Sequence, residues 1–522
     1  MTQLIVCEKY RIARAVANAL KATLNPAYGV YTNGDITVAY VHRSFIKPVG
    51  LDKAANGSLP FVPEKFKIAV TDKKRDRVLK PLFRNAKEVV FASDEGADAQ
   101  ARFFNICRHF RVGHPTSRMW LPRITRSSIR RSFSKREKGR HLHNLAQSGL
   151  VAGAMDMMFE YNFAGVLKRW YYEGDPLTRK EVVAMQYLGD MDEQAAQYDA
   201  QPKAYRIFLD YGGLHLVSDQ SWQSERVCAA IVDTIPVGEP VKARMTVTEE
   251  DAPVVRLHTM LTLQMDAFDN FCFMPSLTVR TAEKLYEQGF ISSPYVTAPD
   301  AGNGITVLRR LSKRATKTER SLYRLIAGRM DAAAMTPDKK QYATVTAEIA
   351  GLTFSCRWEV REPKPEYPGT SEQTITIVEK MMAPVKEVSP ISYGFVPTLA
   401  NLTGYATLTA DTMHPDMPYC HTVHEYGTAL EGLMRKGFIT IEDGTIACTP
   451  EGDRLLLDLA PYNLAHSILV GQYGADEIPY GTITGRKAVK GFGEWLTDTV
   501  TDILRYTPKT NDRTDSDNLY RD

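Results

Sequence analysis

Two apolar segments near the N-terminus, each typical of a buried strand, lead directly into acidic side chains. Residues 4–7 end at Glu8, and residues 89–91 lead to Asp94 and Asp98. Ligands of open α/β sheets collect at the carboxyl ends of strands, so we expect these acids to share one edge of a sheet. Carboxylates in such a place suit a hard divalent cation beside a phosphate. Acids at strand ends also serve simply to solvate turns.

Each apolar segment is followed by a pattern typical of a helix, so residues 1 to about 140 predict a parallel α/β domain. The first helical stripe reaches Leu24 and the second reaches Phe110. The stripe residues are Ile12, Val16, Leu20 and Leu24, then Phe103, Ile106 and Phe110.

Several segments resemble the type IA DNA topoisomerases. CEKYRIARAVANAL is similar to the opening of the metal-binding TOPRIM domain, and LAQSGLVAGAMDMMFEYN resembles a helix with Asp and Asn six apart, here Asp156 and Asn162. LTVRTAEKLYEQGFISSPYVT looks like the helix and turn that present the nucleophilic tyrosine. Further similar segments are VH at 41–42, LPFVPEKFKI, SLYRLIAGRMDAAAMTPDKKQYATVTAEIAGLTFSCRWEV and ALEGLMRKGFITIEDGTIACTPEGDRLL. They follow the family's order from residue 2 to about 457.

The resemblance implies a multidomain α/β chain with α and β parts, in which a TOPRIM domain precedes a toroidal arch. We expect a TOPRIM domain with a basic end (1–140), a helical DNA-binding base (141–204 and 389–505), β-rich arch segments (205–262 and 339–388), a shortened helical insert (263–338) and a disordered polar tail (506–522).

The sequence differs from the family at the positions that carry the family's catalytic residues. The family's Asp-x-Asp-x-Glu motif is here Asp94, Gly96 and Asp98, so one carboxylate is absent and another is shortened. Ser293 stands at the tyrosine position, and Tyr295 stands where the family keeps an arginine. The segment 295–322 is too short for the family's His-containing part, and Lys180-Glu181-Val182-Val183 replaces Gly-Arg-Val-Gln.

Three functions follow from the resemblance. In the first, Tyr295 or Ser293 attacks a DNA phosphate, while magnesium at Glu8, Asp94 and Asp98 positions the strand and Lys9 balances charge. Such an enzyme would cleave, pass and reseal single strands of negatively supercoiled DNA without ATP. In the second, the protein is a catalytically impaired clamp on single-stranded DNA in replication or DNA transfer. In the third, it is a TOPRIM nuclease.

Charge distribution favours a nucleic-acid partner. The net charge is only +4, but one stretch carries nine basic residues with Glu137 as its only acid. This run predicts phosphate contacts, and Trp120 and Phe133 within it can stack on bases; a solvated helix face is the alternative. The basic residues are Arg118, Arg123, Arg126, Arg130, Arg131, Lys135, Arg136, Lys138 and Arg140.

Other candidate DNA contacts are His42, Asn162 and His424. His42 also suits a structural role, and His421 and His424 favour a helix start over a metal pair. The seven cysteines include no Cys-x-x-Cys pair, which argues against a zinc ribbon and for reduced thiols in the cytoplasm. We expect no membrane span, no nucleotide site, a monomer and an origin in a mobile element.

Overall fold

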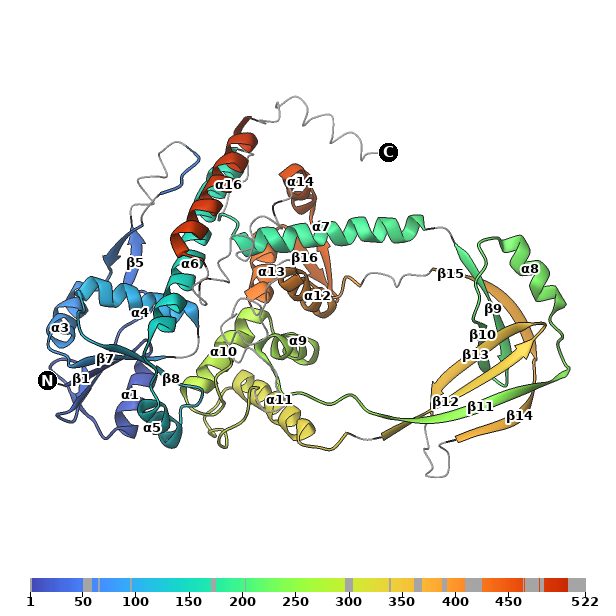
Figure 1. Cartoon of the computed structure of the whole chain (residues 1–522), viewed down its shortest axis with the longest axis horizontal. Helices are drawn as coiled ribbons and strands as arrows, with labels where there is room; N and C mark the ends of the chain where they lie inside the picture. Colours follow the sequence, from blue (N-terminus) through green and yellow to red (C-terminus); the bar gives the residue numbers. More distant parts are fainter. Residues whose placement is uncertain are drawn as a thin grey trace. The chain divides into compact units, whose positions relative to one another are not determined.

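The computed structural model describes residues 2–49, 59–63, 66–93, 96–169, 175–201, 203–295, 304–337, 339–360, 369–386, 392–408, 425–462, 464, 478 and 483–505. The chain forms two compact units (Figure 1). The first comprises Met1–Gly189, Arg256–Met330 and Tyr393–Asp522, and the second comprises Asp190–Val255 and Asp331–Ser392.

The N-terminal part of the first unit is a six-stranded sheet in the order β2-β3-β4-β1-β7-β8. Strand β1 is apolar and almost wholly buried, because it lies between two parallel neighbours with helices packed on the sheet. Cys7 pairs with Ala92, so Glu8 follows β1 beside the end of β7. The strands are β1 (Gln3–Cys7), β2 (Thr23–Asn25), β3 (Val30–Thr32), β4 (Ile36–Tyr40), β7 (Glu88–Ser93) and β8 (Thr116–Trp120), with a separate pair β5 (Ile46–Val49) and β6 (Lys67–Val70).

Among the described residues, the helices that accompany this sheet are α1 (Tyr10–Ala19), α3 (Lys73–Arg84), α4 (Ala97–Phe110) and α5 (Arg126–Ser134). Ile12 and Val16 of α1 are buried, as are Phe103 and Ile106 of α4, so both expected helical stripes face the core. The first stripe is shorter than its sequence pattern predicts. Helix α1 ends at Ala19, and Leu24 instead lies in the short edge strand β2 with half of its surface exposed.

Longer helices complete the first unit. Helix α6 packs against both α4 and α16 (Figure 1). At Gly149 of α6, a Cβ would lie 2.4 Å from the carbonyl oxygen of Ala97, so only glycine permits this close approach to α4. The elements are α6 (Arg140–Arg169), α7 (Arg179–Ala200, shared with the second unit), α9 (Met260–Phe271), α10 (Pro275–Glu287), α11 (Lys317–Ala333, which ends in the second unit), α12 (Phe395–Leu408), α13 (Glu425–Arg435), β16 (Ile439–Glu442), β17 (Thr445–Cys448), α14 (Pro450–Leu459), η2 (Ala460–Tyr462) and α16 (Gly485–Arg505).

The second unit is a seven-stranded antiparallel sheet in the order β14-β11-β12-β13-β10-β9-β15, with α8 (Glu225–Thr234) packed against β9 and β15. Two segments that are far apart in the sequence build this sheet together. Strands β11 and β12 pair from Ala243↔Ala347 to Asp251↔Lys339, so the helical residues between them leave and return at neighbouring strands. The strands are β9 (Ala204–Tyr211), β10 (Leu214–Ser218), β11 (Pro240–Asp251), β12 (Lys339–Ile349), β13 (Leu352–Glu359), β14 (Gly369–Thr376) and β15 (Glu379–Val385).

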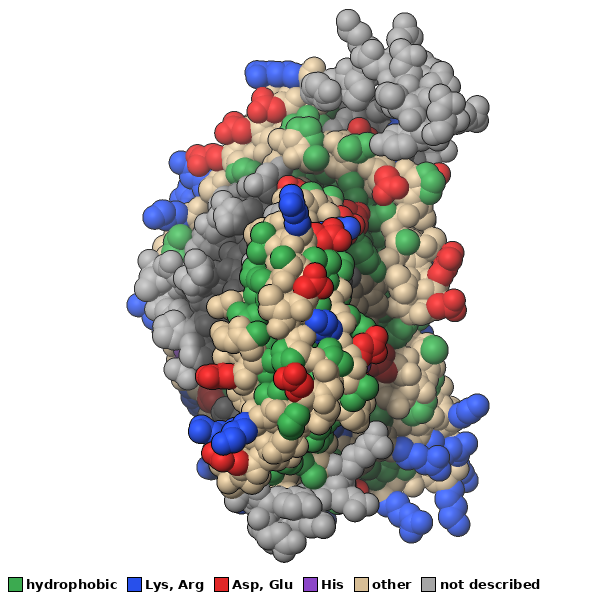
Figure 2. Space-filling model, turned by 90° about the vertical axis from the view of Figure 1, so that its right-hand side faces the viewer, with side chains coloured by type: hydrophobic (Ala, Val, Ile, Leu, Met, Phe, Trp, Pro, Cys, Tyr) green, Lys and Arg blue, Asp and Glu red, His purple; other side chains and the backbone are tan. Residues whose placement is uncertain are grey.

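The face drawn in Figure 2 mixes acidic, basic and hydrophobic side chains. A surface of mixed sign does not focus a strong field on a polyanion. Among the described helices, none combines the length and apolar character that crossing a membrane requires.

Candidate active site

Glu8 lies at the carboxyl end of β1, where only 4% of its surface is exposed. Both of its carboxylate oxygens have partners. Arg102 of α4 donates from Nε to Oε1 at 2.5 Å and from Nη2 to Oε2 at 3.2 Å, and the Ser93 hydroxyl donates to Oε2 at 3.0 Å. Such a two-point guanidinium–carboxylate pair is strong and fixes the orientation of both side chains.

Next to Glu8, a second charged group joins the α/β domain to helix α10. The Lys9 ammonium lies 3.0 Å from Glu287 Oε1 and 3.6 Å from Glu283 Oε1. Arg43 links both acidic positions, with Nε 3.8 Å from Glu8 Oε2 and Nη1 3.7 Å from Glu283 Oε1. The carboxylate of Glu283 thus faces two cations delivered by the edge of the sheet.

The turn after α10 places Tyr295 at this same carboxylate. Its phenol donates a hydrogen bond to Glu283, while its backbone N–H donates to the Ser293 hydroxyl at 3.3 Å. Ser293 is 1% exposed, and its N–H donates to the Pro122 carbonyl at 2.8 Å. The structure therefore brings Tyr295, Lys9 and Glu8 together around Glu283, whereas Ser293 is enclosed below the turn.

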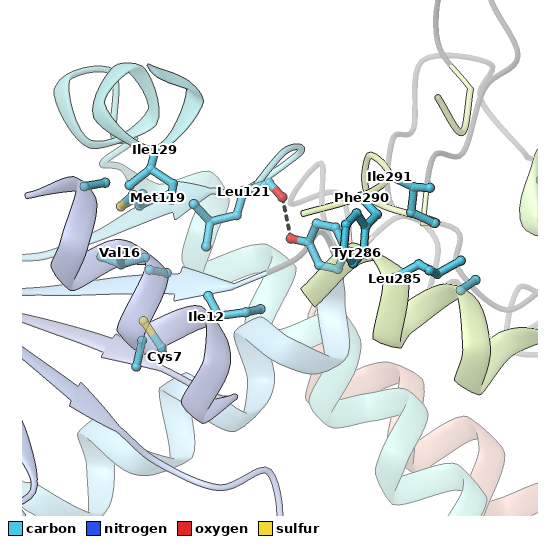
Figure 3. Packing of buried hydrophobic residues seen from close by; sticks show 14 of the residues in the cluster. Cys7, Ile12, Val16, Met119, Leu121, Ile129, Leu285, Tyr286, Phe290 and Ile291 are labelled. Carbon is cyan, nitrogen blue, oxygen red and sulfur yellow. Dashed lines mark hydrogen bonds between the residues drawn. The ribbon is translucent and has the colours of Figure 1, made fainter. Parts of the chain in front are cut away.

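The turn is held by continuous packing between α10 and the loop after β8. Leu285, Tyr286, Phe290 and Ile291 belong to the same buried cluster as residues of β1, α1 and β8 (Figure 3). The fully buried Tyr286 hydroxyl donates to the Leu121 carbonyl at 2.5 Å. Gly289 has φ +72°, and a Cβ there would lie 2.7 Å from the Ile124 carbonyl oxygen, so glycine is required at this turn.

A magnesium site was expected from Glu8, Asp94 and Asp98. Asp94 lies outside the described residues, and Asp98 is in the first turn of α4. Burial by itself lowers the pKa of the Arg102 guanidinium. The hydrogen bonds to Glu8 and the negative charges of Glu8 and Asp98 outweigh burial, so the pKa of Arg102 is raised. The described residues hold no group of three His, Cys, Asp or Glu side chains able to bind a metal. The carboxylates suit a cation, and the cation bound to Glu8 here is Arg102.

The basic stretch divides into buried and exposed members. Arg118 is fully buried between the rings of Phe91 and Trp120, each centroid 4.3 Å from its guanidinium carbon, so it is not available to a DNA phosphate. Arg136 and Lys138 bind Glu88 at 3.0 and 2.8 Å. Exposed members remain for DNA contact: Arg123, Arg126, Arg130, Arg131, Lys135 and Arg140.

The other candidate contacts differ in their surroundings. His42 is exposed, and its Nδ1 accepts from the Ser44 N–H at 3.1 Å. Asn162 is fully buried and bonds both the N–H and the carbonyl of Phe61, so its amide holds the chain rather than a ligand. His421 and His424 lie outside the described residues.

Sequence reasoning missed Arg43, Arg102, Glu283 and Glu287. Arg102 comes one helical turn after Asp98, and Glu283 and Glu287 are one turn apart just before the tyrosine turn. An i,i+4 acidic pair on the helix leading to a candidate nucleophile is a usable signal, because both side chains then lie on one face.

The chain is similar in sequence to known proteins. DNA topoisomerase 3 of Staphylococcus saprophyticus is 25% identical over 301 residues, which cover 55% of this chain and 42% of that protein. DNA topoisomerase 3 of Staphylococcus aureus strain MRSA252 is 21% identical over an alignment of 607 positions, covering 99% of this chain and 84% of that protein. The first of these matches thus spans less than half of its relative.

Full-length topoisomerase I from Thermotoga maritima superposes with a TM-score of 0.69 at 16% identity, covering 95% of this chain and 90% of that one. No protein-family model matches the chain. The expected fold is confirmed by the structural likeness, and the resemblance in sequence is confirmed by the two relatives.

Proposed function

We propose that this chain, a divergent type IA topoisomerase-like protein, cleaves a single DNA strand with the phenol of Tyr295 and reseals it. The observation that carries this proposal is the hydrogen bond from Tyr295 to Glu283, at a carboxylate that Lys9 and Arg43 also contact. A nucleophile needs a positioned base, and this arrangement supplies one.

Proton transfers among these residues conserve charge over the whole reaction. Glu283 takes the phenolic proton as the Tyr295 oxygen forms a bond to phosphorus. The bond from phosphorus to a sugar oxygen breaks, and the Lys9 ammonium donates a proton to that leaving oxygen. Glu283 and Lys9 lie 3.6 Å apart, so the proton passes between them and restores the starting charges. The reverse steps reseal the strand.

Arg43 supports the same transfer electrostatically. Its side chain is 38% exposed, so it can reach a phosphate while staying near Glu8 and Glu283. A fixed cation near a phosphoryl group stabilises the charge that develops in the transition state. Arg43 thereby offers the positive charge that the family places where this chain has Tyr295.

Magnesium dependence is part of the proposal. Glu8 and Asp98, with Asp94 next to Ser93 in the sequence, provide the oxygen ligands that this ion prefers. When bound, magnesium would neutralise phosphate charge and orient the strand. Arg102 donates to both oxygens of Glu8, so its positive charge opposes the binding of a second cation there.

A second candidate function is a clamp that grips single-stranded DNA without cutting it. The Arg102–Glu8 pair and the absence of an acid at Gly96 favour this function, because both weaken the case for a metal. In either case the partner is DNA, mainly single-stranded or underwound, and we propose a cytoplasmic monomer of a replication or DNA-transfer system.

The test is relaxation of negatively supercoiled plasmid with magnesium, combined with trapping of a protein–DNA adduct on end-labelled single strands. Tyr295→Phe should abolish both signals, and Glu283→Gln should lower the cleavage rate about a hundredfold or more. Ser293→Ala tests the alternative nucleophile, and Tyr28→Phe, an exposed tyrosine, is the matched control. Adduct formation that survives in Tyr295→Phe contradicts the proposal. Strand binding without any adduct supports the clamp.

A further inference from the structure

A pocket of about 820 Å³ opens beside the candidate active site within the first unit. Helix α1 contributes Tyr10, Arg11 and Arg14, and the start of α5 contributes Arg126. The end of α10 contributes Glu287, and Arg309 comes from the segment that packs on the turn after that helix. The pocket thus lies between the α/β domain and the helical segment that carries Tyr295.

Four arginines give this pocket a concentrated positive charge. Arg11, Arg14 and Arg126 are exposed, and in the described part of the chain none of the three forms an ion pair with an acid. Arg309 is fixed in place, because it donates to the Gln288 carbonyl and lies 4.4 Å from the ring centroid of Phe290. The one acid of the lining, Glu287, is already bound by Lys9.

Guanidiniums around one cavity repel one another, and an anion bound between them would relieve this repulsion. Guanidinium is also the group that binds phosphate oxygens at two points. The cavity is open and large enough for a nucleotide unit, and ligand pockets of this size class are common.

The pocket adjoins the candidate active site. Tyr10 follows Lys9 directly, and Glu287 contacts Lys9 and lines the pocket. Glu283 and Glu287 lie four residues apart on α10, about 6 Å along the helix axis. A strand whose phosphate lies at Tyr295 can therefore place a neighbouring phosphate between Arg11, Arg14 and Arg126.

We propose that this arginine pocket binds nucleotide phosphates of the DNA strand adjoining the bond that Tyr295 attacks, which rests on the proposed function. Because its arginines come from both sides of the packing between α10 and the α/β domain, a bound phosphate also holds these two parts together. The same phosphate chemistry is offered by a free nucleotide, so the source must be tested.

Binding of a labelled single-stranded oligodeoxynucleotide is measured by fluorescence anisotropy over a salt series, with Tyr295→Phe as background to prevent cleavage. Each phosphate contact to a single strand contributes about −0.7 to the slope of log K against log salt. The double substitution Arg11→Ala with Arg14→Ala should weaken binding about tenfold or more and reduce the slope by about 1.4. Arg77→Ala, an exposed arginine of α3, is the matched control and should change neither value.

The possible results separate phosphate binding by the pocket from DNA cleavage by Tyr295. An unchanged slope in the double variant overturns the pocket, even if Tyr295 forms an adduct with DNA. If the double substitution reduces the slope but the protein with Tyr295 intact never forms an adduct, the result supports phosphate binding by the pocket and contradicts the proposed catalytic function. A mononucleoside triphosphate that binds the Arg11–Arg14 site as tightly as the oligodeoxynucleotide overturns the assignment to a DNA strand. Because both arginines are exposed, thermal unfolding should match the wild type and excludes a folding defect.

Discussion

The guanidinium of Arg102 holds both oxygens of Glu8, at 2.5 and 3.2 Å, in the place where a metal would bind that carboxylate. The positive charge of Arg102 repels a divalent cation that approaches the same carboxylate, so the two compete for Glu8. The strength of this pair therefore decides how much magnesium the site needs.

Replacing Arg102 tests this competition. Arg102→Ala should bind magnesium at least tenfold more tightly than the wild type, measured by calorimetric titration with the metal alone. Without magnesium the variant should lose roughly 3 kcal/mol of stability, because the buried carboxylate loses its main partner. Arg102→Lys, which keeps the charge but not the two-point geometry, should fall between them. Equal magnesium affinity in all three proteins would remove Glu8 from the proposed metal site.

The hydroxyl of Tyr286 tests the packing below the tyrosine turn. Tyr286→Phe leaves the Leu121 carbonyl without this donor and should cost about 1–3 kcal/mol. Hydrogen exchange should report faster opening of α10 and of the loop after β8. The exposed Tyr323 hydroxyl donates to the Arg309 carbonyl, and Tyr323→Phe should change stability by less than about 0.5 kcal/mol. A similar loss of stability in both variants would show that the buried hydrogen bond contributes no more than the exposed one.

Backbone geometry at the same turn gives a second test. Gly289→Ala must adopt φ +72° and bring a Cβ to 2.7 Å from the Ile124 carbonyl oxygen, so it should destabilise the protein by more than about 1 kcal/mol. Gly328→Ala within α11, where nothing beyond the neighbouring helix backbone lies within 4 Å of the added carbon, should stabilise by up to about 1 kcal/mol. Thermal unfolding of the two variants compares them directly. An unchanged Gly289→Ala would mean that the turn relaxes freely.

Glu88 makes the stability of the α/β domain depend on pH in the acidic range. Burial alone raises the pKa of this carboxyl, but hydrogen bonds from Arg136 and Lys138, with the charge of Arg136, outweigh burial and lower the pKa to about 2 from an ordinary 4.5. Its contribution is complete above about pH 4.5 and is lost as the pH falls toward 2, because the unfolded chain then binds the proton more readily.

The acid response is measured by hydrogen exchange of β1 and β7 between pH 5 and 2.5. Glu88→Gln should flatten the loss of protection across this range and lower stability near neutral pH by roughly 3 kcal/mol. Glu494→Gln, in an exposed ion pair with Lys490, is the matched control and should leave the profile unchanged. A wild-type slope in Glu88→Gln would assign the acid response to other carboxyls.

The sequence predicts those features that depend on local pattern. The apolar run of β1 and the placement of Glu8 at its end follow from short-range periodicity, as does the buried face of α4. The end of α1 was missed because Leu24 continues the helical spacing while the chain turns into β2.

Contacts between distant segments could not be read in this way. The charge of Arg118 suggests solvent or DNA, but two aromatic rings enclose it, and ring stacking with a guanidinium leaves no mark in the local sequence. The pairing of Arg102 with Glu8, and of Tyr295 with Glu283, depends on tertiary packing across the chain. A family resemblance supplied the candidate nucleophile, while its acidic partner became visible only in three dimensions.

Strands β11 and β12 pair as in a β-hairpin up to Asp251 and Lys339, and residues 252–338 are inserted between them. Excising this segment and joining the two strands through an Asn-Gly turn would keep every strand of the seven-stranded sheet. The β unit is thus suited to separation as a smaller protein.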